Sequence, residues 1–248
     1  MIKEGGYRFN KVPGNLNNPL ISVITVSLNT GKHLENCINS LLTQPFKSFE
    51  HIIMDGGSED NTVAIFKKYD ASLAYWRSEK DTGIYNAMNK ALSFAKGKWL
   101  LFLGADDELL TGFSEMAVLL KKPDCIYYGD FLFRDKNAGS RYNTYKLAKT
   151  NICHHAIFYP KTVFEKYSYA EKYKISADHF LNIQCWVDPQ FKWQYHSKLI
   201  CNFSSNGISS RQHDNCFEKD RLGIIKKYLG LPSYFRYLFR RFKASLKF

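Results

Sequence analysis

Apolar residues follow two alternating patterns along the first half of the chain. Continuous apolar runs rich in β-branched residues, which are typical of buried strands, occupy residues 20–28, 49–54, 73–76 and 99–103. Segments with apolar residues at every third or fourth position, which indicate amphipathic helices, occupy residues 31–43, 62–69 and 83–95. Because strands and helices alternate, the pattern predicts a parallel sheet with helices packed on it.

The second half of the chain has a less regular pattern. Strands are expected at residues 126–133 and 156–159, a helix at 177–186, one or two strands within 191–203, and a loop at 204–210. We therefore predict an α/β fold with a mostly parallel central sheet and helices on both faces. One domain is expected over residues 1–215, followed by a basic amphipathic helical tail at residues 216–248.

The composition is that of a globular protein. The longest uninterrupted apolar run has five residues, 99–103, whereas a membrane-spanning helix needs about 20. No apolar stretch opens the chain, so no signal peptide is expected. Six cysteines are scattered without a C-x-x-C pair, and we expect them to be reduced. These features together indicate a cytoplasmic location.

Positive charge is concentrated at the C-terminal end. Of the net charge of +12, residues 217–248 carry +7, from nine basic and two acidic residues. At helical spacing, the apolar residues of this tail share one face, and basic residues cover the remainder; the apolar residues are Phe235, Leu238, Phe242 and Leu246. This pattern is typical of a helix lying in an anionic membrane surface, for which residues 231–248 are the candidate. The alternative is a helix that packs its apolar face on the domain.

Polar residues follow several of the predicted strands, where a parallel sheet places its ligands. They are Asn29, Asp55, Asp81, Asp106 and Asp107. Adjacent carboxylates repel each other, so Asp106 and Asp107 favour a shared Mg²⁺ or Mn²⁺ ion over the alternative of a helix cap. On this interpretation, Asp107 serves the cation and not the core. The Asp55 segment is either a simple glycine turn or a contact for a nucleobase or ribose.

Two common nucleotide-binding motifs are missing. The chain contains neither G-x-G nor G-x-x-x-x-G-K-[ST], so a nicotinamide dehydrogenase and a P-loop nucleotide hydrolase are disfavoured.

Four segments together resemble the family 2 glycosyltransferases, which have a GT-A fold. They are residues 21–29, 55–60, 78–90 and 103–107, in the family's order and separation. The likeness is weaker after residue 110, where it rests on His154-His155, Ser176-Ala177-Asp178 and residues 207–210. The resemblance implies that residues 20–110 bind a nucleotide sugar and residues 111–215 bind the acceptor. It argues against processive synthesis, because Q-x-x-R-W is absent.

The resemblance also implies roles for single residues. Thr25, Ser27 and Asn29 would line the nucleobase pocket, which Asp55 would also contact. Asp81 would contact the nucleotide or the donor sugar, and Asp106 and Asp107 would hold the metal, with Asp107 as the direct ligand. Asp178 would be the general base, although Ala177 stands where many members have Glu.

The sequence leaves the roles of three histidines and one arginine open. Arg211 and His213 could close over a pyrophosphate or lie in a solvated loop. His154 and His155 could be buried structural residues or contacts for acceptor or phosphate.

The expected function is that of an inverting, metal-dependent hexosyltransferase in bacterial surface polysaccharide biosynthesis. By resemblance its donor is a UDP-sugar, and its acceptor a lipid-linked glycan on the inner face of the cell membrane. The alternative enzyme is a nucleotidyltransferase, which would release pyrophosphate. A non-catalytic nucleic-acid binder would leave the strand-end aspartates unexplained, so no nucleic-acid partner is expected.

Overall fold

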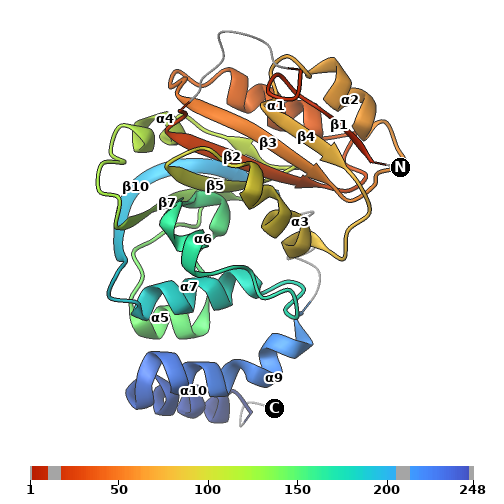
Figure 1. The fold of residues 1–248 in the computed structure, drawn as a ribbon. Helices are drawn as coiled ribbons and strands as arrows, with labels where there is room; N and C mark the ends of the chain where they lie inside the picture. Colours follow the sequence, from red (N-terminus) through yellow and green to blue (C-terminus); the bar gives the residue numbers. More distant parts are fainter. Residues whose placement is uncertain (1, 11–17, 205–212, 246–248) are drawn as a thin grey trace.

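The computed structural model describes residues 2–10, 18–204 and 213–245, which form one mixed sheet with helices on both faces (Figure 1). The strand order is β1-β4-β3-β2-β5-β9-β7-β10-β6, and β8 pairs with β7. The strands of the first half are β1 (Lys3–Gly5), β2 (Ile21–Ser27), β3 (Phe49–Asp55), β4 (Tyr75–Ser78) and β5 (Trp99–Gly104). Those of the second half are β6 (Glu108–Leu109), β7 (Cys125–Phe133), β8 (Lys136–Asn137), β9 (Ile157–Pro160) and β10 (Lys192–Phe203).

The predicted parallel sheet corresponds to β4-β3-β2-β5. In this part of the sheet Ser27 pairs with Asp55, and Asp55 pairs with Ser78, so the strands end in register. The second half differs from a purely parallel sheet: β7 and β10 are parallel, but β9 runs antiparallel to both β5 and β7. The register of the first half brings its polar strand ends to one edge.

Helices cover both faces of the sheet. The helices on one face are α1 (Leu34–Leu42), α2 (Thr62–Lys68) and α4 (Gly112–Ala117), which pack through Leu41, Phe66 and Phe113. Those on the other face include α3 (Ile84–Ala91), α5 (Thr144–Lys149) and α7 (Ala177–Val187), which share one core cluster. Short helical segments complete the fold: η1 (Leu92–Phe94), η2 (His154–Ala156) and α6 (Thr162–Lys166). The predicted α/β class is therefore confirmed.

The C-terminal tail is helical and joins the core. It comprises α9 (Asn215–Ile224), the π-helical η3 (Ile225–Leu229) and α10 (Gly230–Ser245), and α10 contacts α5. Ser233 and Tyr237 are buried on the inner side of α10 and Leu238 is half-buried. The exposed apolar face therefore differs from the predicted one: it consists of Leu231, Phe235, Phe239 and Phe242. The prediction was wrong for Leu238, while Leu246 lies outside the described residues.

Two further expectations concern cysteines and membrane spans. All six cysteines are free, and four of them are buried. Within the described ranges, no helix combines the length and the hydrophobicity that crossing a bilayer requires.

Candidate active site

Asp55 closes β3 at the edge where the parallel strands end. Its carboxylate is buried and accepts five hydrogen bonds, from the backbone of Gly57 and Ser58 and from the hydroxyls of Ser27, Ser58 and Ser78, at 2.5–3.2 Å. This geometry supports the glycine-turn interpretation of the Asp55 segment, while a contact of Asp55 with a nucleobase or ribose stays a prediction. Asp55 holds the glycine turn, and it holds it at the mouth of the sheet.

The loops after β2 and β3 are fastened to each other. Asn29 adopts a left-handed backbone with φ of 52°, which Asn tolerates better than most residues. Its N–H donates to the Ser58 hydroxyl at 2.7 Å, and its side-chain oxygen accepts from the Glu59 N–H at 2.9 Å. Asn29 is exposed at the rim of this edge, and its role in lining a nucleobase pocket stays a prediction.

Asp81 lies over the same turn from the neighbouring loop. A Cβ added to Gly56 would come within 2.8 Å of an Asp81 oxygen, so a larger residue there would push the Asp81 side chain aside. Burial raises the pKa of Asp81, a rise that the repulsion of Asp55 increases and the Gly83 N–H opposes. The sheet edge therefore concentrates negative charge, as expected for a site that receives a cation or a polar ligand.

Thr25 lies deeper in the sheet than its predicted role requires. It is fully buried, and its hydroxyl is 2.9 Å from His51 Nε2. Ser27 is also buried but touches Asp55 and Thr30, directly beneath the edge. Thr25 therefore supports the site from below and does not line it.

Burial lowers the pKa of His51 to about 3, so the stability of the protein should depend on pH in the acid range. An unfolded histidine titrates near pH 6.5. Because the folded pKa is depressed, the stability that neutral His51 contributes is present above about pH 6.5 and is lost as pH falls toward 3. We expect the free energy of unfolding to fall across this window, and His51→Gln to flatten the fall in urea titrations at each pH. The exposed His33 is the matched control, and an equal flattening in His33→Gln would contradict the assignment.

Asp106 and Asp107 turn toward the same point beside Gly104. A Cβ added to Gly104 would lie 2.5 Å from an Asp107 oxygen and 3.2 Å from an Asp106 oxygen. Asp106 is half-buried, whereas the Asp107 side chain is 1% exposed. Asp107 accepts the Ser204 N–H at 2.7 Å and forms an ion pair with His155 Nδ1 at 2.6 Å. Asp107 thus belongs to the packed interior as well as to the predicted metal motif.

The two partners of this ion pair shift each other's pKa in opposite directions. Burial alone would raise the pKa of Asp107, but the positive charge of His155 outweighs burial and the pKa lies below its usual range. Burial would lower the pKa of His155, but Asp107 raises it to about 9. Each partner therefore stabilises the charged form of the other.

The carboxylate pair suits a divalent cation that is completed by substrate. Among the described residues, no three His, Cys, Asp or Glu side chains cluster closely enough to hold a metal by themselves. Mg²⁺ and comparable ions are commonly held by one or two carboxylates together with substrate phosphates. Two carboxylates converging beside Gly104 fit that arrangement, with Asp106 as the more accessible of the two.

Asp178 begins α7 and is the most heavily hydrogen-bonded carboxylate on the acceptor side. One oxygen accepts from Tyr85 Oη at 2.9 Å and from the His179 N–H at 2.8 Å. The other accepts from Asn151 Nδ2 at 2.7 Å and from His154 Nδ1 at 2.8 Å. Burial would raise the pKa of Asp178, but the bond to His154 and the other donors lower it.

The two adjacent histidines connect the two carboxylates. They lie on the single turn of η2, with ring centroids 3.9 Å apart and planes at 77°, so His155 reaches Asp107 while His154 reaches Asp178. Because Asp178 only accepts, His154 Nδ1 carries the proton. Its Nε2 is buried and has no hydrogen-bond partner among the described residues. Burial and the charge of His155 lower the pKa of His154, which keeps the ring neutral.

Sequence reasoning left this histidine pair undecided. The only available signal was two histidines before a strand. The remaining predicted residue, Arg211, lies outside the described residues, and His213 is exposed at the start of the C-terminal helices.

Comparisons with known proteins point to one enzyme family. The profile of glycosyl transferase family 2 matches residues 22–188. A PGL/p-HBAD biosynthesis glycosyltransferase of Mycobacterium bovis is 33% identical over 223 residues, covering 83% of this chain and 87% of that protein. The putative teichuronic acid biosynthesis glycosyltransferase TuaG of Bacillus subtilis is 38% identical over 93 residues, or 36% of this chain and 37% of that protein.

Solved structures share the fold. S. aureus TarS 1-349 superposes with a TM-score of 0.64 and 18% identity, covering 84% of this chain and 64% of that chain. This chain therefore spans less than two thirds of that structure. A mannosyltransferase from Pyrobaculum calidifontis, solved with GDP-Man and Mn²⁺, has a TM-score of 0.62 and 14% identity, covering 88% of this chain and 67% of that chain. These similarities show the GT-A glycosyltransferase fold.

Proposed function

The chain belongs to glycosyl transferase family 2, and from this premise we propose that it moves a hexose from a UDP-sugar to a lipid-linked glycan in surface polysaccharide biosynthesis. UDP is supported by TarS, which was solved with UDP and with UDP-GlcNAc. Polysaccharide biosynthesis is supported by the name of TuaG, and a lipid-linked acceptor by the proposed membrane contact described below. The observation that carries the proposal is the placement of Asp107 and Asp178 on the two sides of one histidine pair.

The proposed reaction is a single displacement with inversion. The acceptor hydroxyl forms a bond to the anomeric carbon as the bond to the diphosphate oxygen breaks, and the nucleoside diphosphate leaves with that electron pair. Asp178 takes the hydroxyl proton. Because four donors already occupy Asp178, one of them must move to admit the hydroxyl; His154, which bonds it at 2.8 Å, positions the carboxylate.

Asp106 and Asp107 would hold the divalent cation, Mn²⁺ or Mg²⁺. When bound, such an ion stabilises the negative charge that develops on the leaving diphosphate. The protein's own contribution is to keep Asp107 ionised, through the positive charge of His155.

A thermal-shift screen tests the donor assignment. UDP, GDP, CDP and dTDP are added with and without Mn²⁺, since a ligand that binds the native state raises the unfolding midpoint. We expect UDP with Mn²⁺ to give the largest rise. A reaction that releases pyrophosphate instead of a nucleoside diphosphate would indicate a nucleotidyltransferase and overturn the proposal.

We also propose that α10 rests on the inner face of the cell membrane. Its exposed face carries Leu231, Phe235, Phe239 and Phe242, three of them phenylalanines at least 60% exposed. Exposed basic residues flank this face, namely Arg236, Arg240, Arg241 and Lys243. An exposed apolar stripe beside cations matches an anionic lipid surface, where each cation contributes about 1 kcal/mol.

The membrane proposal is tested with Phe235→Ser/Phe239→Ser. We expect the double variant to lose roughly tenfold or more in binding to phosphatidylglycerol vesicles, because each buried phenylalanine contributes about 1.5–3 kcal/mol. Flotation with vesicles of rising phosphatidylglycerol content measures it. Phe9, half-exposed and remote from α10, provides the control variant Phe9→Ser.

These substitutions are preferable to deleting residues 231–248, because deletion would also remove the buried Tyr237 from the core. Weak vesicle binding by the unaltered protein would contradict the proposal. It would leave α10 as a helix that only packs on the domain.

A further inference from the structure

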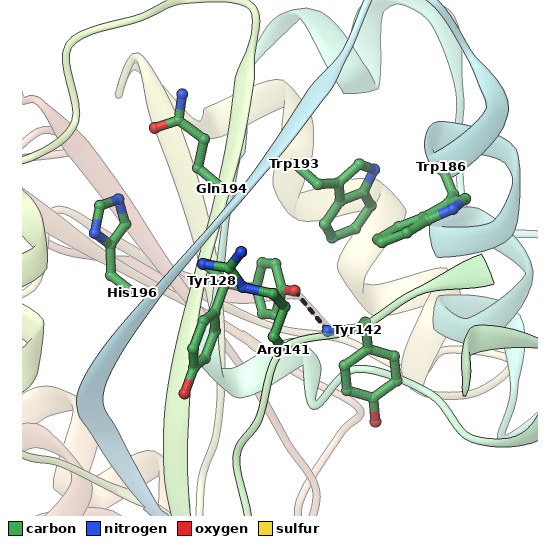
Figure 2. A pocket seen from close by; sticks show the side chains of 8 residues that line it. Tyr128, Arg141, Tyr142, Trp186, Trp193, Gln194 and His196 are labelled. Atoms are coloured by element: carbon green, nitrogen blue, oxygen red, sulfur yellow. Dashed lines mark hydrogen bonds between the residues drawn. The ribbon is translucent and has the colours of Figure 1, made fainter. Parts of the chain in front are cut away.

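A cavity lies away from the strand-end aspartates, between β7, β10, α7 and the segment before α5 (Figure 2). Its volume of about 300 Å³ is at the lower limit for pockets that bind small molecules. Five of its eight lining residues are aromatic rings of Trp or Tyr: Tyr128, Tyr142, Trp186, Trp193 and Tyr195. Arg141, Gln194 and His196 supply the polar atoms.

The rings form a connected wall. Trp193 lies 5.4 Å from Trp186 and 5.8 Å from Tyr128 between ring centroids, and Tyr128 lies 5.3 Å from Tyr195. Figure 2 shows the two indoles side by side. Neither Trp186 nor Trp193 is fully buried, so part of each indole stays open to a ligand.

Unused hydrogen-bonding capacity accompanies this wall. Trp193 Nε1 is buried and has no partner among the described residues, whereas Trp186 Nε1 donates to Thr144 at 3.1 Å. Arg141 is exposed, with its guanidinium 6.0 Å from the Tyr195 ring centroid. The cavity thus combines flat apolar faces with an exposed guanidinium beside them. A pyranose ring has the matching surfaces, a face of C–H groups and a perimeter of hydroxyls.

The cavity is separate from the strand-end aspartates, but α7 and a chain of hydrogen bonds connect it to Asp178, the candidate base. Trp193 is near the beginning of β10, whereas Phe203 at its end packs on His155 with 5.1 Å between ring centroids. On the acceptor side, α7 carries Asp178 in its first turn and Trp186 in its last, about 12 Å apart at 1.5 Å per residue. Tyr142, which lines the cavity, donates to the Asn151 carbonyl at 2.5 Å, and Asn151 donates to Asp178.

We propose that this aromatic cavity binds a pyranose unit of the acceptor glycan, a few units away from the hydroxyl that reacts. The inference rests on the proposed function, because it assigns the glycan to the acceptor side. Such a subsite would select long acceptors over short ones.

Direct binding tests the cavity without any transfer reaction. The probes are arrayed oligosaccharides, up to six units long, of glucose, galactose, rhamnose, N-acetylglucosamine and glucuronic acid. We expect the intact chain to bind at least one series, and Trp186→Ala and Trp193→Ala each to weaken it tenfold or more. Trp186→Phe should retain most binding, since it keeps an aromatic face. Tyr69→Ala, which removes a half-exposed ring from the distant end of α2, is the matched control and should bind like the parent.

Kinetics provide the second arm. Trp186→Ala should raise KM for a tetrasaccharide acceptor about tenfold, leave its kcat unchanged, and leave KM for a monosaccharide glycoside unchanged. Absence of array binding, or binding that survives both tryptophan substitutions, would overturn the inference. If array binding depends on the tryptophans but no sugar is transferred, the cavity stands and the proposed function fails. Thermal stabilisation of each variant by UDP shows whether it is folded.

Discussion

Replacing Asp178 with Asn should lower the turnover number by about 100- to 10,000-fold, the usual contribution of a general base. The amide keeps the shape of the carboxylate but cannot take the proton of the acceptor hydroxyl. The nucleotide site should be spared, because the hydrogen-bond partners of Asp178 in the described part of the chain are Tyr85, Asn151, His154 and His179, and the predicted nucleotide contacts Asn29, Asp55 and Asp81 are not among them.

The same contacts predict a stability cost for Asp178→Asn. Each carboxylate oxygen accepts two hydrogen bonds, so the new NH₂ group must face donors. Neutral His154 can relieve one clash by moving its proton to Nε2. We expect about 1–3 kcal/mol of destabilisation, measured by urea unfolding. A variant that loses UDP affinity and keeps its turnover number would identify Asp178 as a donor-site residue instead.

Replacing Asp107 with Ala should reduce transfer about 1000-fold or more, since a carboxylate that holds a metal supports several kcal/mol of charge stabilisation. It should also remove the Mn²⁺-dependent part of UDP stabilisation in thermal shifts. Asp106→Ala is the matched comparison: it removes the neighbouring, more accessible carboxylate and leaves the Asp107–His155 ion pair in place.

Asp107→Ala carries a structural penalty that Asp106→Ala does not. It removes the carboxylate that raises the pKa of His155, so the buried ring loses its ion-pair partner, and breaking a buried pair in this way costs about 3–5 kcal/mol. Asp107→Ala/His155→Ala removes both charges and should recover much of the stability without recovering transfer. If Asp107→Ala kept full activity with the parent's metal dependence, the metal assignment would be wrong.

The sequence predicted the first half of the fold well, because a strand buried on both faces is apolar throughout. Residues 20–28 and 49–54 therefore stood out, and the polar residue after each strand marked the edge where ligands bind. The parallel register of β2, β3 and β5, which brings these residues together, follows from the same alternation of strands and helices.

The environment of Asp107 and the exposed face of α10 could not be predicted in this way, because they depend on contacts between segments distant in the sequence. Asp107 was expected to serve a cation and not the core. In the structure its side chain is buried, and it forms an ion pair with His155, which lies 48 positions later in the chain. Helical spacing likewise placed Leu238 with the apolar surface residues of the tail. Only the packing of α10 on α5 shows that Phe239 is exposed and Leu238 is half-buried. Spacing identifies the faces of a helix but not which face the domain covers.

The first residues of the chain bear on how the protein should be produced. β1 pairs antiparallel with β4, the outermost strand of the parallel half, and Arg8 pairs at 3.1 Å with the buried carboxylate of Glu50. An expression clone that starts after residue 10 would expose the backbone donors and acceptors of β4, which favours aggregation. It would also leave the buried carboxylate of Glu50 without the charge of Arg8. An affinity tag is therefore better fused before Met1 through a spacer than substituted for these residues.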